Sequence, residues 1–427
     1  MSEVGFMDVK EKIVGHVESE EKEIVSFLQE LVKIPTPTPP GENYDKIAEL
    51  VAEKCRSFDW ETHLCEAPEK YLDMTGREAY GLLGPRVNVV STIKGSKDRP
   101  TLVYNAHTDM VPVGPGWSVE PYSATIKDNV IYGRGASDDK AGVAAMIYAM
   151  ETLQEMGIKL PGRTVLTATV DEEIGGFAGL NYLIAEGIVG GDYGISLDGS
   201  ITNVTVALNG RLRWRIHAYG RSVHSSIAFR GVNAIEKMAK IVLAIQAHGK
   251  ALQEKYTKIP APPEVGKPFI YPIASVGVIQ GGVKDNIVPD RCTIAIDRRV
   301  TPEETLDSAR GEFRSVVEAV QREDQEFKYE IEEVSVREPC YTPIDHPLAL
   351  TMKKISSEIL GEETTICGSP GSSDVSFMVN QGKIPTVSLG PGRLENNVHG
   401  VDEHLSIKDL LALTKIHAIA AVELTHA

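Results

Sequence analysis

The sequence predicts an α/β fold, a mostly parallel sheet flanked by helices, with a smaller α+β domain inserted into it. Three observations predict this arrangement. Strand-like and helix-like segments alternate over the first 200 residues, alternating polar and apolar residues replace them near residue 209, and the first pattern returns after Cys340. A chain of 427 residues also exceeds one typical core. We expect one domain over 1–208 and 339–427, and an inserted domain over 209–338.

The first domain is predicted from its apolar segments. Helical spacing occupies residues 20–33 and 43–58 before the alternation begins. Apolar runs rich in β-branched residues predict strands at 86–93, 101–106, 163–170 and 193–198, with a helix at 141–156. After Cys340 the chain predicts a helix at 347–360, a strand at 385–389 and a final helix from about residue 406.

The inserted domain is predicted from a strict alternation. In RLRWRIHAY, the apolar Leu212, Trp214 and Ile216 alternate with arginines, which is typical of a sheet with one packed and one solvated face. Asn233 is predicted to cap a helix. The apolar stripe of that helix consists of Ile235, Met238, Val242 and Ile245. Two alternating strands, a helix at 303–322 and a last strand complete the domain.

Charge and cysteine content exclude several classes of protein. The formal charge is -16, from 44 Lys+Arg and 60 Asp+Glu spread along the chain, which disfavours a nucleic-acid or anionic-membrane surface. The five cysteines form no C-x-x-C pair, so neither a disulfide framework nor a thiolate zinc site is expected. No signal peptide or membrane-spanning run is visible, and we expect a cytoplasmic protein.

Acidic and histidine residues follow four predicted strands of the first domain. They are His107 and Asp109, the run 171–173, Asp198, and His399 after a Gly-rich loop, while Asp138 precedes a helix. Ligands bind beyond the carboxyl ends of parallel strands, so these groups could meet at one rim. Imidazoles and carboxylates without cysteine suit zinc, cobalt or manganese. Their surplus over one ion's needs suggests two ions sharing a carboxylate.

Each of these signals has an ordinary alternative. Glu172 and Glu173 could begin a charged helix, Asp138 and Asp139 could cap the next helix, and Asp198 could belong to a turn. Six other histidines fall on segments without evident acidic partners and are predicted to be structural: His16, His63, His248, His346, His417 and His426. His404 remains undecided.

Several motifs together resemble the M20 metallopeptidases. In order along the chain, they are HTD (107–109), GRGASDDKAG (133–142), DEEIGG (171–176), GRSVHSS (220–226), KDNIVPD…DRR (284–299) and NNVHGVDE (396–403). The resemblance spans nearly the whole chain. It implies a zinc-exopeptidase-like catalytic domain, and it implies that the insert is a lid and dimerisation domain.

The resemblance also implies a centre of two divalent ions, usually zinc. His107 and Asp198 would hold one ion, Glu173 and His399 would hold the other, and Asp138 would bridge them. Glu172 would be the general base, and Asp109 would support His107. A cis peptide bond between Asp138 and Asp139 is implied as well.

Residues of the insert would bind the substrate. The resemblance implies that His224 reaches the active site of a partner subunit in a homodimer. It implies that the substrate carboxylate is held by Asn286, Arg299, Gly371 and Ser372. Arg298 is an equally available guanidinium at this stage.

We therefore expect an amidohydrolase that cleaves the amide of an N-acyl amino acid with a free carboxylate. A metallocarboxypeptidase or dipeptidase acting on short peptides is the first alternative, and a catalytically silent protein that binds amino-acid derivatives is the second. Asp198 stands where desuccinylase-like members often carry Glu, and 64–85 looks like an insertion relative to the shorter biosynthetic deacylases.

Overall fold

The computed structural model describes residues 3–426, with side chains from Asp8 onward. Its contacts divide the chain into two units. The first unit comprises Met1–Val206, Thr342–Cys367 and Ser373–Ala427, and the second comprises Ala207–Tyr341 and Gly368–Ser372. The predicted boundaries were 209 and 338, and the short segment Gly368–Ser372 was not predicted to belong with the insert. A lid or dimerisation role for the second unit remains a prediction.

The first unit is built on a mixed sheet whose central strands are parallel; its last strand, β13, and the final residues of β8 and β14 are counted with the second unit. Strands follow the order β1-β2-β6-β3-β7-β15-β8-β13, with β14 paired to β8. β3 runs parallel to β6 and β7, and β15 runs parallel to β7, whereas β1 and β2 are antiparallel additions. The bounds are β1 (Glu61–Glu66), β2 (Val87–Ile93), β3 (Thr101–His107), β6 (Arg163–Thr169), β7 (Tyr193–Ser196), β8 (Asn203–Leu208), β13 (Cys340–Tyr341), β14 (Thr365–Ser369) and β15 (Thr386–Ser388).

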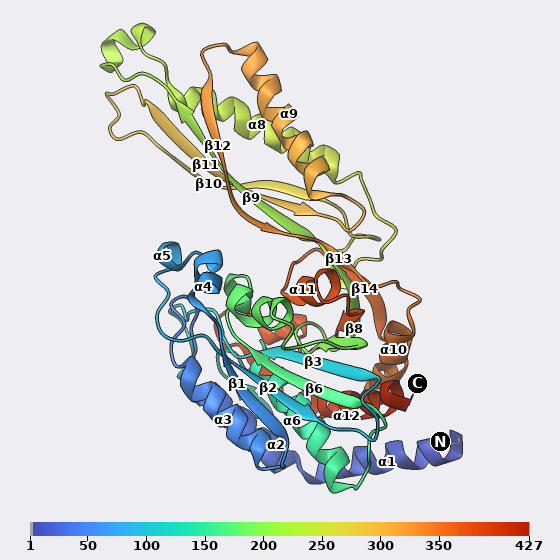
Figure 1. The fold of residues 1–427 in the computed structure, drawn as a ribbon. Helices are drawn as coiled ribbons and strands as arrows, with labels where there is room; N and C mark the ends of the chain where they lie inside the picture. Colours follow the sequence, from blue (N-terminus) through green and yellow to red (C-terminus); the bar gives the residue numbers. More distant parts are fainter. Residues whose placement is uncertain (1–2, 427) are drawn as a thin grey trace. The chain divides into compact units, whose positions relative to one another are not determined.

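Helices pack on both faces of this sheet (Figure 1). On one face Val103 of β3 belongs to a core cluster with Leu180, Leu183 and Met378 from the helices opposite. On the other face the Tyr104 hydroxyl donates to the backbone oxygen of His417, 2.7 Å away. The predicted α/β fold class is therefore confirmed.

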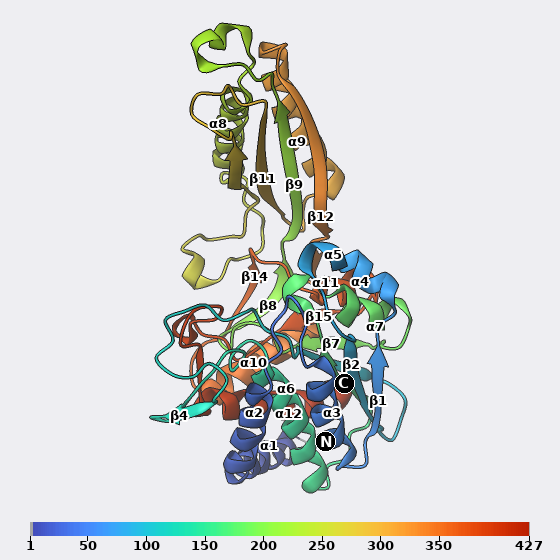
Figure 2. The ribbon, with the colours of Figure 1, turned by 90° about the vertical axis from the view of Figure 1, so that its left-hand side faces the viewer.

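The five helices predicted for the first unit are present as α2, α3, α6, α10 and α12, whereas α1, α4, α5, α7 and α11 were not predicted. Helices α1, α2, α6 and α12 lie side by side (Figure 2). The helices are α1 (Glu3–Ser19), α2 (Glu21–Lys33), α3 (Tyr44–Arg56), α4 (Glu69–Thr75), α5 (Arg77–Tyr80), α6 (Lys140–Glu155), α7 (Tyr182–Ala185), α10 (Pro347–Leu360), α11 (Val375–Asn380) and α12 (Ile407–His426). Shorter turns are η1 (Glu172–Ile174), η2 (Phe177–Asn181) and η5 (Leu394–Asn396), and β4 (Thr125–Lys127), β5 (Val130–Tyr132) and β16 (His404–Ser406) form a small sheet. Between residues 3 and 426, none of the helices combines the length and apolar character needed to cross a bilayer.

The second unit contains an antiparallel sheet in the order β10-β11-β9-β12. Its strands are β9 (Gly210–Tyr219), β10 (Ile273–Gly281), β11 (Arg291–Val300) and β12 (Lys328–Arg337). Its helices are α8 (Ala234–Leu252) and α9 (Leu306–Glu323), with short turns η3 (Ser225–Arg230) and η4 (Pro263–Val265). Leu212, Trp214 and Ile216 of β9 pack into the core with both helices, and the Trp214 ring stacks on Phe313 at 3.9 Å.

One detail of the predicted α8 stripe is wrong. Asn233 caps the helix, since its side chain accepts from the backbone N–H groups of Ile235 and Glu236. Ile235, however, is 38% exposed, and Ile241 is buried in its place beside Met238. The buried stripe runs through Ala234, Met238, Ile241 and Ile245, and Ile235 lies one position to the side of it.

Candidate metal centre

The polar residues at the strand ends of the first unit converge. His107 is the last residue of β3, and its Nε2 lies 3.0 Å from Asp138 Oδ1. His399, from the loop after β15, places its Nε2 3.0 Å from the other Asp138 oxygen and 2.9 Å from Glu173 Oε1. Asp138 therefore offers one oxygen to each of two imidazoles that arrive from different parts of the chain.

These contacts make two overlapping groups of possible ligands. His107, Asp138 and Asp198 form one group, and Asp138, Glu173 and His399 form the other; within each group, ligand atoms lie within 4.8 Å of one another. We call these five residues the strand-end cluster. Asp138 belongs to both groups, as a carboxylate that bridges two ions must.

The charge of the strand-end cluster fits divalent cations. Burial raises the pKa of Asp198 to about 7, and the neighbouring Asp138 charge adds to this effect. Burial also raises the pKa of Glu173. Burial acts in the same direction on Asp138, but hydrogen bonds from His107 and His399 outweigh it and leave its pKa below the usual range. Carboxylates gathered in this way without cysteine are a donor set for zinc-like ions.

Asp138 and Asp139 do not simply cap the following helix. They are joined by a cis peptide bond, and the Asp139 side chain makes no cap hydrogen bond to α6. Its Oδ2 instead accepts from the His107 backbone N–H at 3.3 Å. A side chain at Gly142 would bring a Cβ within 2.3 Å of Asp139 Oδ1, so this position needs glycine.

Asp109 contacts both the histidine and the acidic turn. Its Oδ1 lies 3.4 Å from His107 Nδ1 and accepts from the Glu172 backbone N–H at 3.1 Å. Its Oδ2 accepts from the Glu173 backbone N–H at 3.2 Å. A fully buried carboxylate thus fixes the imidazole orientation and the start of η1 together.

Glu172 lies beside the cluster. Its Oε1 accepts from the Asp374 backbone N–H at 3.3 Å. Burial, followed by the charge of Asp374, raises the pKa of Glu172 well above its ordinary value. A carboxylate of raised pKa is suited to accept and return a proton near neutral pH.

Asp171, the first residue of the acidic run, contacts Arg86 and Tyr44 instead of the strand-end cluster. It accepts from Arg86 Nε at 2.9 Å and from the Tyr44 hydroxyl at 2.8 Å, and the Arg86 and Asp171 side chains are fully buried. Arg86, directly after the segment 64–85, and Tyr44 therefore support the backbone next to Glu172. Breaking such a buried pair leaves an uncompensated charge.

Glu403 and Arg134 were missed from sequence. The Glu403 side chain is fully buried, and its Oε1 accepts from the backbone N–H groups of Ser137 and Asp138 at 3.0 and 3.1 Å. Arg134 bonds Glu403 at 2.5 Å and also donates to the His399 backbone oxygen at 3.1 Å. Both residues stand inside the motifs quoted above, but their partnership joins positions 269 residues apart.

The residues predicted to bind substrate all lie in the second unit. His224 is exposed and its Nδ1 accepts from the Ser226 backbone N–H, while the Asn286 backbone oxygen accepts from Ser225. Arg299 donates to Asp297 at 2.6 Å and to the Ser372 hydroxyl at 3.4 Å. The Gly371 backbone N–H donates to the Ser369 hydroxyl.

Arg298 and Arg299 are no longer equivalent. Arg298 is 1% exposed and donates to Glu304 at 2.6 Å, on the face that packs against the helices. Arg299 faces the opposite side with Asp297. Of the two guanidiniums, Arg299 is thus the one available to a ligand.

Three of the histidines predicted to lack acidic partners have them. His16 Nε2 lies 3.0 Å from Glu155 and groups with Glu20, while His63 and His248 lie 3.5 and 3.9 Å from Glu61 and Glu312. The prediction was wrong because those carboxylates come mostly from other elements. The His404 ring lies 5.2 Å from the Tyr132 ring, tilted by 33°, and His404 belongs to neither ligand group.

Comparisons with known proteins give a family match over most of the chain. Residues 103–423 match the family model described as peptidase family M20/M25/M40. The chain is 26% identical over 434 residues to an N-formyl-4-amino-5-aminomethyl-2-methylpyrimidine deformylase of Halalkalibacterium halodurans, covering 96% of each protein. Further curated relatives are named succinyl-diaminopimelate desuccinylase and acetylornithine deacetylase.

Solved structures share the fold. Human carnosine dipeptidase 1 superposes with a TM-score of 0.76 at 18% identity, covering 98% of this chain and 99% of that one. A Bacillus subtilis protein described as a dinuclear metal binding peptidase from the M20 family gives 0.67 at 16% identity, with 96% and 99% covered.

Proposed function

Because the chain belongs to peptidase family M20/M25/M40, whose members hydrolyse amide and peptide bonds, we propose that it is a two-metal amidohydrolase acting on an N-acyl amino acid with a free carboxylate. The observation that carries this proposal is the Asp138 carboxylate, shared between two groups of ligands. The adjacent Glu172 supplies a proton acceptor.

The strand-end cluster would hold the two ions. His107 and Asp198 would complete one coordination sphere and Glu173 and His399 the other, with Asp138 common to both. We propose zinc first, with cobalt or manganese as alternatives for this donor set. When bound, a pair of such ions lowers the pKa of water and polarises an amide carbonyl.

Glu172 would move the proton. Its carboxylate would take a proton from the attacking water and return it to the leaving nitrogen, which lets one residue serve as base and then as acid. Burial raises its pKa, which favours uptake of a proton from the attacking water. Asp109 would keep Glu172 in place by accepting a hydrogen bond from the Glu172 backbone N–H.

The second unit would recognise the substrate. We propose that Arg299 and Ser372, with Asn286 and Gly371, bind the substrate carboxylate, because Arg299 and Ser372 already lie 3.4 Å apart on the open face of the sheet. A planar guanidinium can hold a carboxylate by two parallel bonds. We propose further that the protein is a homodimer through this unit, in which His224 would serve the partner's site.

A second candidate is deformylation of a substrate without a carboxylate. The similarity over 96% of the chain to a deformylase favours it, since the compound in that name carries a formyl amide and no carboxylate. Turnover of N-formyl compounds compared with N-acetyl and N-succinyl amino acids and dipeptides separates the candidates. Turnover of none, by a protein with both ions bound, would leave only the silent binding role.

The test of the mechanism is Glu172→Gln. We expect this variant to keep both ions and to lose activity by about 10³-fold, because the amide cannot accept the proton. Glu53→Gln, at an exposed position of α3, is the matched control and should match the wild type. Metal content is measured on the same preparations. Near-normal turnover by Glu172→Gln would contradict the proposed mechanism.

A further inference from the structure

The solvated face of the second unit's sheet carries an unusual set of arginines. Along β9, the arginines alternate with the buried Leu212 and Trp214, so their side chains share the face away from α8 and α9. Pairing aligns them with arginines of both neighbouring strands: Arg211 stands opposite Arg299 of β11 on one side and opposite Arg337 of β12 on the other. Three guanidiniums thus lie in one row.

A bulge in β12 puts Arg337 into that row. The register shifts between Glu333 and Ser335, so that Ser335 pairs with Arg213 and Arg337 with Arg211. Without the shift, Arg337 would share the face of Ile331, which packs against the core. Bulges turn a side chain to the other face of a sheet, and here the result is a third like charge beside two others.

The next row adds one carboxylate and a fourth guanidinium. It contains Ser275, Asp297, Arg213 and Ser335, and Asp297 accepts from both Arg213 Nε at 3.2 Å and Arg299 Nε at 2.6 Å. We call the two rows together the arginine rows; they contain four guanidiniums and one carboxylate. Like charges placed directly opposite one another destabilise a sheet unless an anion joins them.

Arg211 shows the imbalance most clearly. Its Nε is buried and has no hydrogen-bond partner. Burial, followed by the charges of Arg213, Arg337 and Arg299, lowers the pKa of Arg211 to about 10. A guanidinium held among three others, with an unused buried donor, is prepared for an incoming anion.

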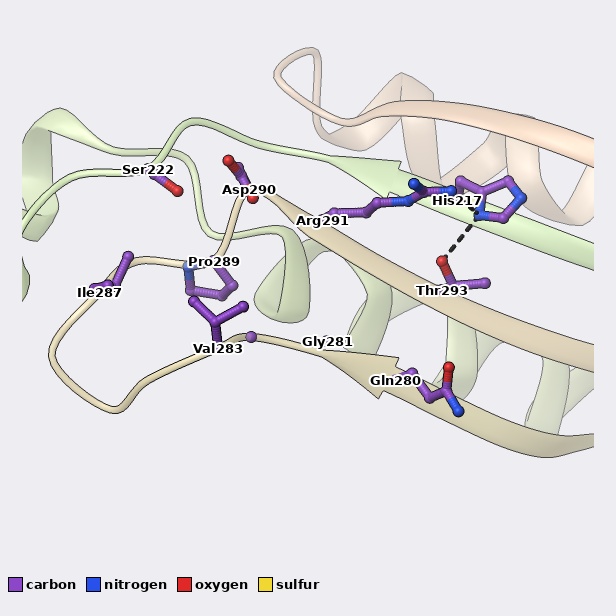
Figure 3. Close-up of a pocket in the computed structure, with 11 residues that line it drawn as sticks. His217, Ser222, Gln280, Gly281, Val283, Ile287, Pro289, Asp290, Arg291 and Thr293 are labelled. Carbon is purple, nitrogen blue, oxygen red and sulfur yellow. Dashed lines mark hydrogen bonds between the residues drawn. The ribbon is translucent and has the colours of Figure 1, made fainter.

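Other arginines of the same face lie apart from these rows. Arg215, two residues further along β9, lies 3.6 Å from Glu332. At the far end of β11, Arg291 lies beside a hollow of about 460 Å³ and contacts His217 Nδ1 at 3.3 Å (Figure 3). That hollow holds one arginine among mainly neutral groups, whereas the arginine rows hold four.

We propose that Arg211 forms an anion subsite, next to the carboxylate site of Arg299 and Ser372, that binds a second carboxylate of the substrate. The preferred substrate then carries two carboxylates, one held by Arg299 as already proposed and one by Arg211. This inference rests on the proposed function. The second carboxylate can belong to the acyl group or to the amino-acid side chain, and neutral amide isosteres distinguish the two sources.

The kinetic test compares matched pairs of substrates. N-acetylglutamate against N-acetylglutamine reports a side-chain carboxylate, and N-succinylleucine against N-succinamoylleucine reports an acyl carboxylate. We expect the wild type to prefer the dianion of at least one pair by about 10-fold in kcat/KM, mainly through KM. In Arg211→Gln that ratio should fall to near one, and Arg211→Lys should restore part of it. Arg215→Gln, on the same strand and face, should leave the ratio unchanged.

A binding experiment separates this inference from the proposed function. Calorimetry with succinate and with butyrate, on metal-loaded protein, requires no turnover. Succinate should bind the wild type more tightly than butyrate does, and Arg211→Gln should remove most of the difference. If succinate binds as expected and no amide is cleaved, the subsite stands and the hydrolase proposal fails. If monoanions are cleaved as well as dianions and succinate shows no advantage, the subsite is overturned.

Discussion

The strand-end cluster and the arginine rows concentrate charge of opposite sign by different means. The cluster gathers carboxylates and imidazoles from the ends of β3, β6 and β7 and from two loops, and its protons can leave when a cation arrives. The arginine rows are aligned by strand register, and guanidiniums keep their protons at any relevant pH. The first region can therefore exchange protons for ions, whereas the second requires an anion.

The largest expected effect tests whether the cluster needs its cations. Removal of metal by a chelator should reduce activity by more than about 10³-fold, and added zinc or cobalt should restore it. Asp138→Asn should lose most of both ions, because its carboxylate belongs to both ligand groups. Asp45→Asn, at an exposed position of α3, should keep both. Metal analysis and turnover are measured together. Full activity in verified metal-free protein would contradict the cluster's role.

The next effect concerns support from outside the cluster. Glu403→Gln should weaken metal binding and turnover by about 10- to 100-fold, because its carboxylate orients the backbone of Ser137 and Asp138 and pairs with Arg134. Glu395→Gln, an exposed residue of the same segment, provides the control. Metal affinity is measured by competition with a chelating dye. Unchanged affinity in a folded Glu403→Gln protein would show that the pair acts only on stability.

His417 is a buried imidazole outside both regions, and it tests the effect of burial without a neighbouring charged group. Burial lowers the pKa of His417 to about 3, so this ring stays neutral in the fold, where Nε2 contacts the Leu389 backbone oxygen at 3.1 Å. The unfolded chain takes up the proton below about pH 6.5, so stability should fall as the pH drops from there. The loss should reach about 2 kcal/mol between pH 7 and 5.

His417→Gln keeps a donor for Leu389 and removes the titration, so its stability should fall less steeply over that range. Urea unfolding at several pH values measures the difference. Equal slopes in both proteins would mean that another group dominates the acid response.

The smallest effect belongs to the arginine rows. Asp297→Asn removes the carboxylate shared by Arg213 and Arg299 and should lower the stability of the second unit by about 1 kcal/mol. Succinate should recover more of this loss in the variant than it adds to the wild type. Thermal unfolding with and without succinate measures both quantities. No gain from succinate in the variant would speak against anion binding there.

Much of the first region could be predicted from sequence because its signals are local. Each strand that ends in His107, Asp198 or the 171–173 run is a short apolar stretch followed by a polar residue, and parallel strands bring such ends together. The role of Glu403 could not be predicted, because its partner Asp138 lies 265 residues away and no local sequence pattern indicates the contact.

The arginine rows could be predicted only in part from the sequence. Alternation along β9 and β11 predicts that Arg211 and Arg299 face solvent. Alternation along β12 would have placed Arg337 on the packed face. The bulge that moves it to the other face lies in a run of apolar and acidic residues, and no residue type there indicates a bulge. The membership of Gly368–Ser372 in the second unit is likewise set by contacts such as that of Gly368 with Pro260, far away in sequence.

The divided first unit has a consequence for how the protein is made. On the ribosome the chain emerges from its N-terminus, and the second unit's sheet is complete once Arg337 has appeared. His399 follows roughly 60 residues later, together with the loop that carries Glu403. A nascent or prematurely released chain therefore contains every strand of that sheet but cannot yet assemble both ligand groups. Under the proposed function, hydrolytic capacity would therefore be absent until His399 and Glu403 have emerged.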